Sequence, residues 1–378
     1  MEPTYKLKDL LLYFLRLGTW GFGGPVALVG YMHRDLVERK RWFDEDQYRE
    51  GLTLAQLAPG PLAAQLGIYF GYVHFGALGA GLCGLAFVLP SFLMVLALGR
   101  AYLAFGGLPW MQSVFYGVGS AVIGIIVLSC YRLTRKTVGT SLREDPLRWV
   151  LFGGSAAVTV WREREEMLLF LAAGLVYMLV RTRPVKGMAL TLWLGFLPAL
   201  QPDGRLWQIG WFFTKAGAFV FGSGLAIIPF LQTGVVHEMG WLTQQQFLDA
   251  VAVAMITPGP VVITVGFIGY LVEGTPGAVV AALGVFLPCY VFTVLPAPYF
   301  RKISGNRYIR AFVDGLTAAV VGALAGSVIV IALRTFTDAL SPFFALATLI
   351  CLIRFKKIPE PVLILAAGVL GYTVRFFF

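Results

Sequence analysis

Two basic residues, Arg16 and Lys215, stand inside apolar stretches of the chain, 199 positions apart. A charge in such a stretch is costly unless it pairs with another group or faces a polar cavity, so both residues are candidates for a functional role. Neither stretch contains an obvious carboxylate partner, and an anionic ligand could fill that place. The alternative is that Arg16, eight residues after Lys8, extends its side chain to the edge of the apolar region.

Each basic residue precedes a glycine-rich segment, and each half of the chain also carries a Pro-Gly-Pro segment. These four segments are GFGGP at 21–25, FGSG at 221–224, and the two PGP segments at 59–61 and 258–260. Proline is favoured at the first position of a helix, so Pro61 and Pro260 could restart helices whose free N–H groups face the break. Such a helix terminus favours anion binding.

Small residues beside the breaks would let a ligand approach the backbone, although tight helix packing is the alternative interpretation. Gln65 and Thr264 occupy equivalent positions and could donate hydrogen bonds to an oxyanion or to a neighbouring helix. The predicted substrate-binding residues are Arg16, Gly23, Gly24, Gln65, Lys215, Gly222, Ser223 and Thr264. The predicted helix-break residues are Pro59, Gly60, Pro61, Pro258, Gly259 and Pro260.

Composition indicates where these residues must be positioned. Of the 378 residues, 58% are hydrophobic and 13% are charged, against about 25% charged in soluble domains. The mean hydropathy is +0.77. Continuous apolar runs such as 78–98 exclude a soluble protein and a transmembrane β-barrel, and they predict an all-α polytopic membrane protein.

The chain is an internal duplication. Arg16 matches Lys215, Trp42 matches Trp241 and the PGP segments match each other at one offset. Six apolar elements are expected in the first half, at 8–31, 52–74, 76–103, 111–131, 147–160 and 166–180. Six more are expected at 209–232, 248–272, 276–299, 312–334, 338–353 and 359–377, with an unmatched linker element at about 187–200.

We therefore predict a first repeat over 1–186, a linker transmembrane helix over 187–206 and a second repeat over 207–378. An even number of elements followed by an odd linker places the two repeats in opposite orientations. The first two elements of each repeat are interrupted. They could be kinked full spans or re-entrant hairpins, and the placement of Lys and Arg favours hairpins, a cytoplasmic N-terminus and an external C-terminus.

Motifs for other kinds of chemistry are missing from the sequence. It contains no GxSxG, P-loop or HExxH motif, which argues against an enzyme. The cysteines lack CxxC spacing and the three histidines are far apart, so we expect neither a metal nor a cofactor. The net charge of +10 is expected to set membrane orientation, with no role in binding nucleic acid. The sequence shows no chain of intramembrane carboxylates for a proton relay; Asp314, near the start of the 312–334 element, is the nearest candidate, and we expect it to act at a helix start instead.

Several segments together resemble the chromate ion transporter family in its long, two-domain form. The first half contains FLRLGTWGFGGPVALVGYM, ERKRWFDEDQY, LAQLAPGP and FVLPSF, and the second FTKAGAFVFGSG, GWLTQQQFL, ITPGPV and FLPCY. The match covers about 7–131 and 207–334. The resemblance implies export of chromate through the inner (plasma) membrane, with sulfate or another oxyanion as the alternative substrate.

Energetics agree with the direction that the resemblance implies. Moving a dianion out of a negative interior gains roughly 4.6 kcal/mol at 100 mV, so export driven by the membrane potential needs no coupling ion, and exchange remains open. The expected partners are chromate and the lipid bilayer, and a homodimer is left open. A non-transporting membrane scaffold or sensor is the alternative from a different class.

Overall fold

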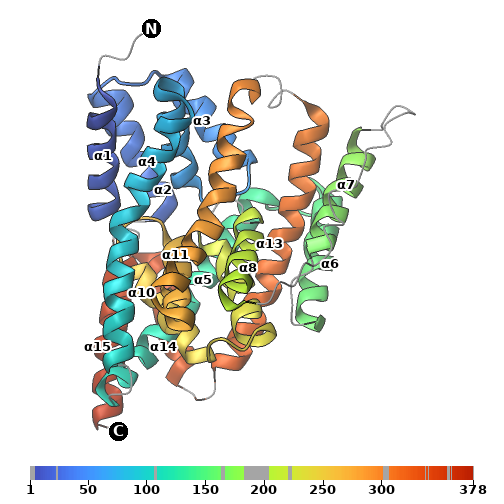
Figure 1. The fold of residues 1–378 in the computed structure, drawn as a ribbon. Helices are drawn as coiled ribbons and strands as arrows, with labels where there is room; N and C mark the ends of the chain where they lie inside the picture. The colour runs from blue at the N-terminus through green and yellow to red at the C-terminus, as the bar shows by residue number, and fades with distance from the viewer. Residues whose placement is uncertain are drawn as a thin grey trace.

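The computed structural model describes residues 5–22, 24–105, 109–162, 167–182, 204–219, 224–300, 306–336, 338, 340–355, 358 and 360–377. Every regular element within these ranges is a helix, which confirms the prediction of an all-α protein. The helices form one elongated bundle, with the N-terminus at its top and the C-terminus at its bottom (Figure 1).

Within the described ranges, four helical stretches are long and apolar enough to cross a membrane: Leu62–Phe105, Met111–Thr137, Val261–Tyr299 and Arg307–Leu333. Shorter apolar helices occupy Leu168–Thr182, Leu340–Arg354 and Glu360–Val374. These helices bear out the prediction of a multi-pass membrane protein. The expected linker element at 187–200 lies outside the described residues.

The first interrupted element is a helical hairpin. Helix α1 (Leu7–Trp20) ends at the glycine-rich break, and α2 (Gly24–Met32) continues into the π-helix η1 (His33–Arg39). The ring of Tyr5, before α1, stacks on Trp42, beyond η1, at a centroid distance of 4.3 Å. The chain therefore reverses at the break and returns to the end where it began. With 14 residues, α1 is about 21 Å long, too short for the roughly 30 Å hydrocarbon core.

The second interrupted element has the same form. Helix α3 (Glu45–Leu57) starts at Asp44, whose carboxylate accepts a hydrogen bond from the Gln47 backbone at 2.7 Å. After the Pro-Gly-Pro break, the first part of α4 (Leu62–Phe105) runs back toward the start of α3. The stacking of Phe43, which precedes α3, on His74 of α4 at 4.8 Å shows this reversal. Gly76, with φ +62°, then turns the chain, and the rest of α4 runs the length of the bundle (Figure 1).

The second half presents corresponding elements in the same order. They are α8 (Arg205–Ala218), η3 (Gly224–Ile227), α9 (Ile228–Gln232), η4 (Thr233–Glu238), α10 (Gln244–Ile256), η5 (Val261–Ile263) and α11 (Thr264–Val294). Phe212 of α8 contacts Phe230 at 5.5 Å and Trp241 at 5.8 Å, so this chain segment also reverses. Gly274, with φ +60°, interrupts α11 as Gly76 interrupts α4.

The outer helices are exchanged between the two halves. They are α5 (Pro109–Thr137), α6 (Pro146–Arg162), α7 (Met167–Thr182), η6 (Ala297–Tyr299), α13 (Arg307–Thr335), α14 (Leu340–Arg354) and α15 (Glu360–Phe377). Helix α5 packs against α14 and α15, and α13 packs against α6 and α7. A Cβ atom on Gly117 would overlap the Ala367 carbonyl oxygen, and one on Gly315 would overlap Tyr177. Glycine at these positions allows the close helix packing that interleaves the halves.

An ionic cluster links α6, α7 and α13, and it corrects the expectation for Asp314. Helix α13 begins at Arg307, so Asp314 lies two turns inside the helix and accepts a hydrogen bond from Arg148 at 2.6 Å. Asp145 accepts hydrogen bonds from Tyr177 and Arg181. Burial by itself raises the pKa of Asp145, but these hydrogen bonds outweigh it and hold that pKa below its ordinary value.

Candidate functional site

The glycine-rich break of the first half touches the Pro-Gly-Pro break of the second half. The backbone N–H of Gly259 donates a hydrogen bond to the Gly21 carbonyl oxygen at 2.9 Å, and both residues are buried. Gly259 has a φ of +94°, which favours glycine. Two segments from different halves are thus joined through their backbones at points where the helices are interrupted.

Ser91 of α4 fastens this junction from the side. Its hydroxyl donates to the Pro258 carbonyl oxygen at 2.7 Å and also lies 3.2 Å from the Gly18 carbonyl oxygen. The side chain is fully buried. Because the ends of interrupted helices carry unpaired carbonyl groups, the hydroxyl satisfies the Pro258 carbonyl and lies within hydrogen-bond distance of one on α1.

The Pro-Gly-Pro break of the first half lies beside Cys289, the residue that corresponds to Ser91 in the repeat. A Cβ atom on Gly60 would lie 2.8 Å from the Gln65 amide and 3.2 Å from Cys289 Sγ of α11. Cys289 occupies the position 198 residues after Ser91, so each break lies against the long helix of the opposite half. The two Pro-Gly-Pro breaks therefore have related surroundings. The hydroxyl of Ser91 hydrogen-bonds to the break at 258–260, and the thiol of Cys289 packs beside the break at 59–61.

The two predicted polar ligands donate to the backbone of their own segments. Gln65 donates from Nε2 to the carbonyl oxygens of Pro59 at 2.9 Å and Ala58 at 3.4 Å, while its buried Oε1 has no partner among the described residues. Thr264 donates to the Val261 carbonyl oxygen at 2.7 Å. In this conformation both side chains hold the break geometry, and their binding of a substrate stays a prediction.

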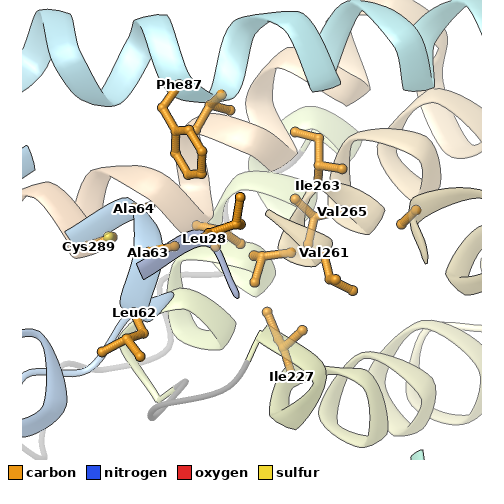
Figure 2. Packing of buried hydrophobic residues seen from close by; sticks show 14 of the residues in the cluster. Leu28, Leu62, Ala63, Ala64, Phe87, Ile227, Val261, Ile263, Val265 and Cys289 are labelled. Carbon is orange, nitrogen blue, oxygen red and sulfur yellow. The ribbon is translucent and has the colours of Figure 1, made fainter. Parts of the chain in front are cut away.

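Apolar side chains close the space around the two restarting helices. Figure 2 shows Leu62 at the start of α4, Val261 in η5, Leu28 from α2 and Ile227 from η3 gathered in one region. All four belong to the main hydrophobic cluster and are buried. These four side chains therefore fill the space between the restarting helices, and a ligand could pass between them only if the segments separated.

A cleft of about 870 Å³ leads toward the first break, and Arg16 lies in its wall. Helix α1 and the two residues after it line one side, from Asp9 to Phe22, and the end of α2, η1 and the residues after η1 form the other side. Its charged and aromatic lining residues are Asp9, Tyr13, Arg16, Trp20, Phe22, Tyr31, Arg34, Asp35, Arg39, Lys40 and Trp42. The basic residues Arg34, Arg39 and Lys40 thus line the cleft from η1 and the residue after it.

The cleft carries an excess of positive charge. Four cations line it against two carboxylates, Asp9 and Asp35. Arg34 and Arg39 both pair with Asp35, at 3.1 and 3.5 Å. The Lys40 ammonium lies over the Trp42 ring at 4.0 Å, and Arg16 has no ion-pair partner within the described part of the chain. Such a cleft raises the local concentration of anions.

Lys215 does not share this cleft with Arg16. Its ammonium lies 5.9 Å from the Trp211 ring centre, and the lining of the cleft comes from residues 9–42. At the 199-residue offset, the positions that match Arg34, Arg39 and Lys40 are Thr233, Glu238 and Met239. The second half therefore lacks the corresponding cations, and the basic cleft is a feature of one half.

The glycine-rich breaks are described in part. Gly24 begins α2 with a φ of +72° and has open space where a Cβ atom would stand. Three other predicted substrate-binding residues, Gly23, Gly222 and Ser223, lie outside the described residues. At the Pro-Gly-Pro segments, α3 ends at Leu57 and α10 at Ile256, with helical structure resuming at Leu62 and Val261.

Sequence reasoning did not identify Ser91, Cys289 or the second wall of the cleft. A signal for the first two was present, because Leu-Pro-Ser and Leu-Pro-Cys occupy matching positions in the repeats. The wall formed by Tyr31 to Trp42 could not be assigned, because it depends on the reversal of the chain after α1.

Comparison with known proteins agrees with these features. A family model described as "Chromate transporter" matches residues 8–179 and 207–372. A "Chromate transport protein" of Cupriavidus metallidurans is 60% identical, over 98% of this chain and 93% of the relative. A "Probable chromate transport protein" of Synechococcus elongatus is 56% identical, over 98% and 96%.

A more distant relative, a "Chromate transport protein" of Pseudomonas aeruginosa, is 32% identical over 99% of this chain and 94% of its own length. No solved structure matches the chain.

Proposed function

Because the chain belongs to the chromate transporter family, we propose that it exports chromate from the cytoplasm across the inner (plasma) membrane. The membrane potential, or exchange for another ion, drives the export. A dianion that leaves a negative interior gains roughly 4.6 kcal/mol at 100 mV, which is enough to hold a gradient of about three decades.

The observation that carries this proposal is the basic cleft beside the first break. Its walls hold four cations and two carboxylates, and Arg16, which has no described ion-pair partner, lies on the α1 wall between the mouth and the break. Chromate enters at Arg34, Arg39 and Lys40 and then pairs with Arg16. A dianion fits this excess of charge, since charge-assisted hydrogen bonds from guanidinium groups to oxyanions are strong.

Release to the outside follows from alternating access around the two breaks. Export requires the closed contact between Gly259 and Gly21 to open, and the freed backbone N–H groups then face the oxyanion. With the repeats in opposite orientations, Lys215 occupies on the exit side the place that Arg16 has on the entry side. The residues Gly23, Gly24, Gln65, Gly222, Ser223 and Thr264 complete the proposed binding site.

The orientation belongs to the same proposal: repeats over 1–186 and 207–378 joined by a linker helix over 187–206, with a cytoplasmic N-terminus and an external C-terminus. The test is to introduce single cysteines between η1 and α3, at Lys40, and between η4 and α10, at Met239, in a chain whose native cysteines are replaced. A membrane-impermeant reagent should label them from opposite faces, and labelling from one face would exclude inverted repeats.

Transport is tested with inverted membrane vesicles and radiolabelled chromate. Expression of the chain should produce uptake that an inside-positive potential increases, and the Arg16→Ala, Lys215→Ala double variant should lose it. Vesicles that accumulate no chromate would instead favour a scaffold or sensor. Competition by excess unlabelled sulfate stronger than that by unlabelled chromate would assign the alternative oxyanion as substrate.

A further inference from the structure

A carboxylic acid is buried in the second half, away from the basic cleft. Asp249 lies on α10 with 3% of its surface exposed. Its Oδ2 accepts a hydrogen bond from the Tyr102 hydroxyl of α4 at 2.7 Å, and its Oδ1 accepts one from Gln245 Nε2 at 2.8 Å. Both donors are neutral.

Asp249 has no cationic partner among the described residues. Helix α10 packs against α4, α5, α9, α11, α15, η4 and η5. Titratable side chains on these elements include Arg100 and Tyr102 of α4, Tyr116 of α5, Tyr270 of α11, Tyr372 of α15, and His237 and Glu238 of η4. Tyr102 is the one that hydrogen-bonds to Asp249, and Arg100, two residues away on the helix, is exposed.

In this environment the charge state of Asp249 determines both the cost of its burial and the strength of its hydrogen bond with Tyr102. An ionised carboxylate taken out of water without a cation is unfavourable, and a proton removes that penalty. When the carboxylate is ionised, the bond from Tyr102 is charge-assisted and about twice as strong as a neutral one. Gain of a proton therefore weakens the link between α10 and α4.

The surroundings leave room for that link to open. A cavity of about 450 Å³ adjoins Tyr102 and is lined by Leu98 of α4, Phe115 of α5 and Val253 of α10. The Tyr102 ring already forms part of its wall, so the ring has space to turn away from Asp249. Helix α10 continues from Asp249 to Ile256, where it meets the second break. A movement of α10 therefore reaches the contact between Gly259 and Gly21.

We propose that Asp249 is a proton-binding site that controls transport: a proton from water adds to its carboxylate, releases Tyr102 and lets α10 move with the break. Loss of that proton to water restores the hydrogen bond and the closed junction. This inference rests on the proposed function, because it assigns a controlling proton to the same transport cycle.

The repeat supplies a matched control. The position 199 residues before Asp249 is Glu50, which is not fully buried, and the position matching Tyr102 is Phe300, which has no hydroxyl. The pair of a buried carboxyl and a tyrosine hydroxyl is thus not repeated at the matching positions, and Glu50→Gln removes the carboxyl at the position that corresponds to Asp249.

The first experiment detects the proton directly. Infrared difference spectra of the purified full chain, titrated from alkaline to acidic pH, should contain the carbonyl band of a buried protonated carboxyl. The band should vanish in Asp249→Asn and persist in Glu50→Gln. A band unchanged in Asp249→Asn would overturn the proposal, whatever the transport activity.

The second experiment measures chromate flux into proteoliposomes over the same pH range. Wild-type flux should change with pH, and Asp249→Asn, which mimics the protonated state, should show only the smaller change that protonation of chromate itself causes. Glu50→Gln should follow the wild type, and identical pH profiles of Asp249→Asn and Glu50→Gln would overturn the proposal.

Tyr102→Phe keeps the carboxyl and removes a donor to its ionised form, so the midpoint at which the infrared carboxyl band appears should move to higher pH. If Asp249→Asn does not fold, this shift decides the question, and an unmoved midpoint would reject the proposal. Absence of chromate flux in the wild type contradicts the proposed function instead, and the infrared result then still stands for the proton site.

Discussion

The backbone amide of Gly259 hydrogen-bonds to the carbonyl oxygen of Gly21 at 2.9 Å. This bond joins the Pro-Gly-Pro break of the second half to the glycine-rich break of the first half. Ser91 binds the neighbouring Pro258 carbonyl at 2.7 Å and so holds α4 to the same point. An opening of the bundle at this place must break backbone contacts between the halves, which makes the junction a suitable gate for alternating access.

Substitution of Gly259 by alanine should prevent the junction from closing. The residue has a φ of +94°, and a Cβ atom there would overlap the Ser91 hydroxyl. Gly274→Ala is the matched control, because that glycine also has positive φ, +60°, but has open space beside it. We expect Gly274→Ala to cost about 1–2 kcal/mol of unfolding free energy and Gly259→Ala clearly more. Thermal unfolding in detergent measures both, and equal losses would contradict the junction.

Loss of the Arg16 charge should weaken chromate binding from the entry side. We expect Arg16→Ala to raise the half-saturating chromate concentration at least tenfold, which corresponds to about 1.4 kcal/mol, and Arg16→Lys to restore part of the affinity. The measurement is uptake into inverted vesicles against chromate concentration. An unchanged value in Arg16→Ala would place the binding charge elsewhere.

The cations Arg34, Arg39 and Lys40 should affect the rate at which chromate enters the cleft more than its affinity at Arg16. Replacing Arg34, Arg39 and Lys40 by glutamine removes three cations of the cleft lining. Uptake at low chromate should fall, and its dependence on ionic strength should become weaker, because steering by exposed charges is screened by salt. The matched control is glutamine at Arg132, Arg135 and Lys136, which line a different pocket and give the same change in net charge. Equal effects of the two triple variants would indicate a non-specific charge effect.

Asp145 should stabilise the contact of α6 with α7, and its contribution should depend on pH. We expect Asp145→Asn to lower the unfolding free energy by about 1–3 kcal/mol at neutral pH, because Tyr177 and Arg181 lose a charged acceptor. The pKa of Asp145 in the folded protein lies below its ordinary value. The stabilisation is therefore complete above the ordinary aspartate value of about 3.9 and is lost as pH falls through the lower folded pKa.

Unfolding of wild type and variant, followed in detergent by circular dichroism at several pH values, checks this prediction. Asp46→Asn is the control, since Asp46 is exposed in the first turn of α3, and it should change stability by less than about 0.5 kcal/mol. A difference between wild type and Asp145→Asn that grows toward acid would be the opposite of the expected sign.

Much of the architecture follows from local sequence features. The apolar stretches predicted the helices, including the short one that the structure places at Pro146–Arg162. The Pro-Gly-Pro segments predicted the places where α3 and α10 end, because proline and glycine act on the backbone at their own positions. Arg16 and Lys215 are separated by the same 199 residues as the two Pro-Gly-Pro segments. This shared offset indicates the duplication, and it can be found from the sequence alone.

The contacts between distant segments needed the tertiary structure. Asp314 was expected to begin a helix, whereas the structure pairs it with Arg148, 166 positions away. Arg16 and Lys215 were expected to bind one substrate, and this stays a prediction; the structure adds that Arg16 lies in a cleft whose second wall includes η1.

The sequence by itself determined which residues could break helices and carry charge, since those properties belong to single residues and short segments. Tertiary structure decided that Gly259 meets Gly21 and that Asp249 meets Tyr102. These pairs depend on how whole helices reverse and pack across the two halves. That packing minimises the free energy of the entire bundle, so a local sequence pattern cannot predict it.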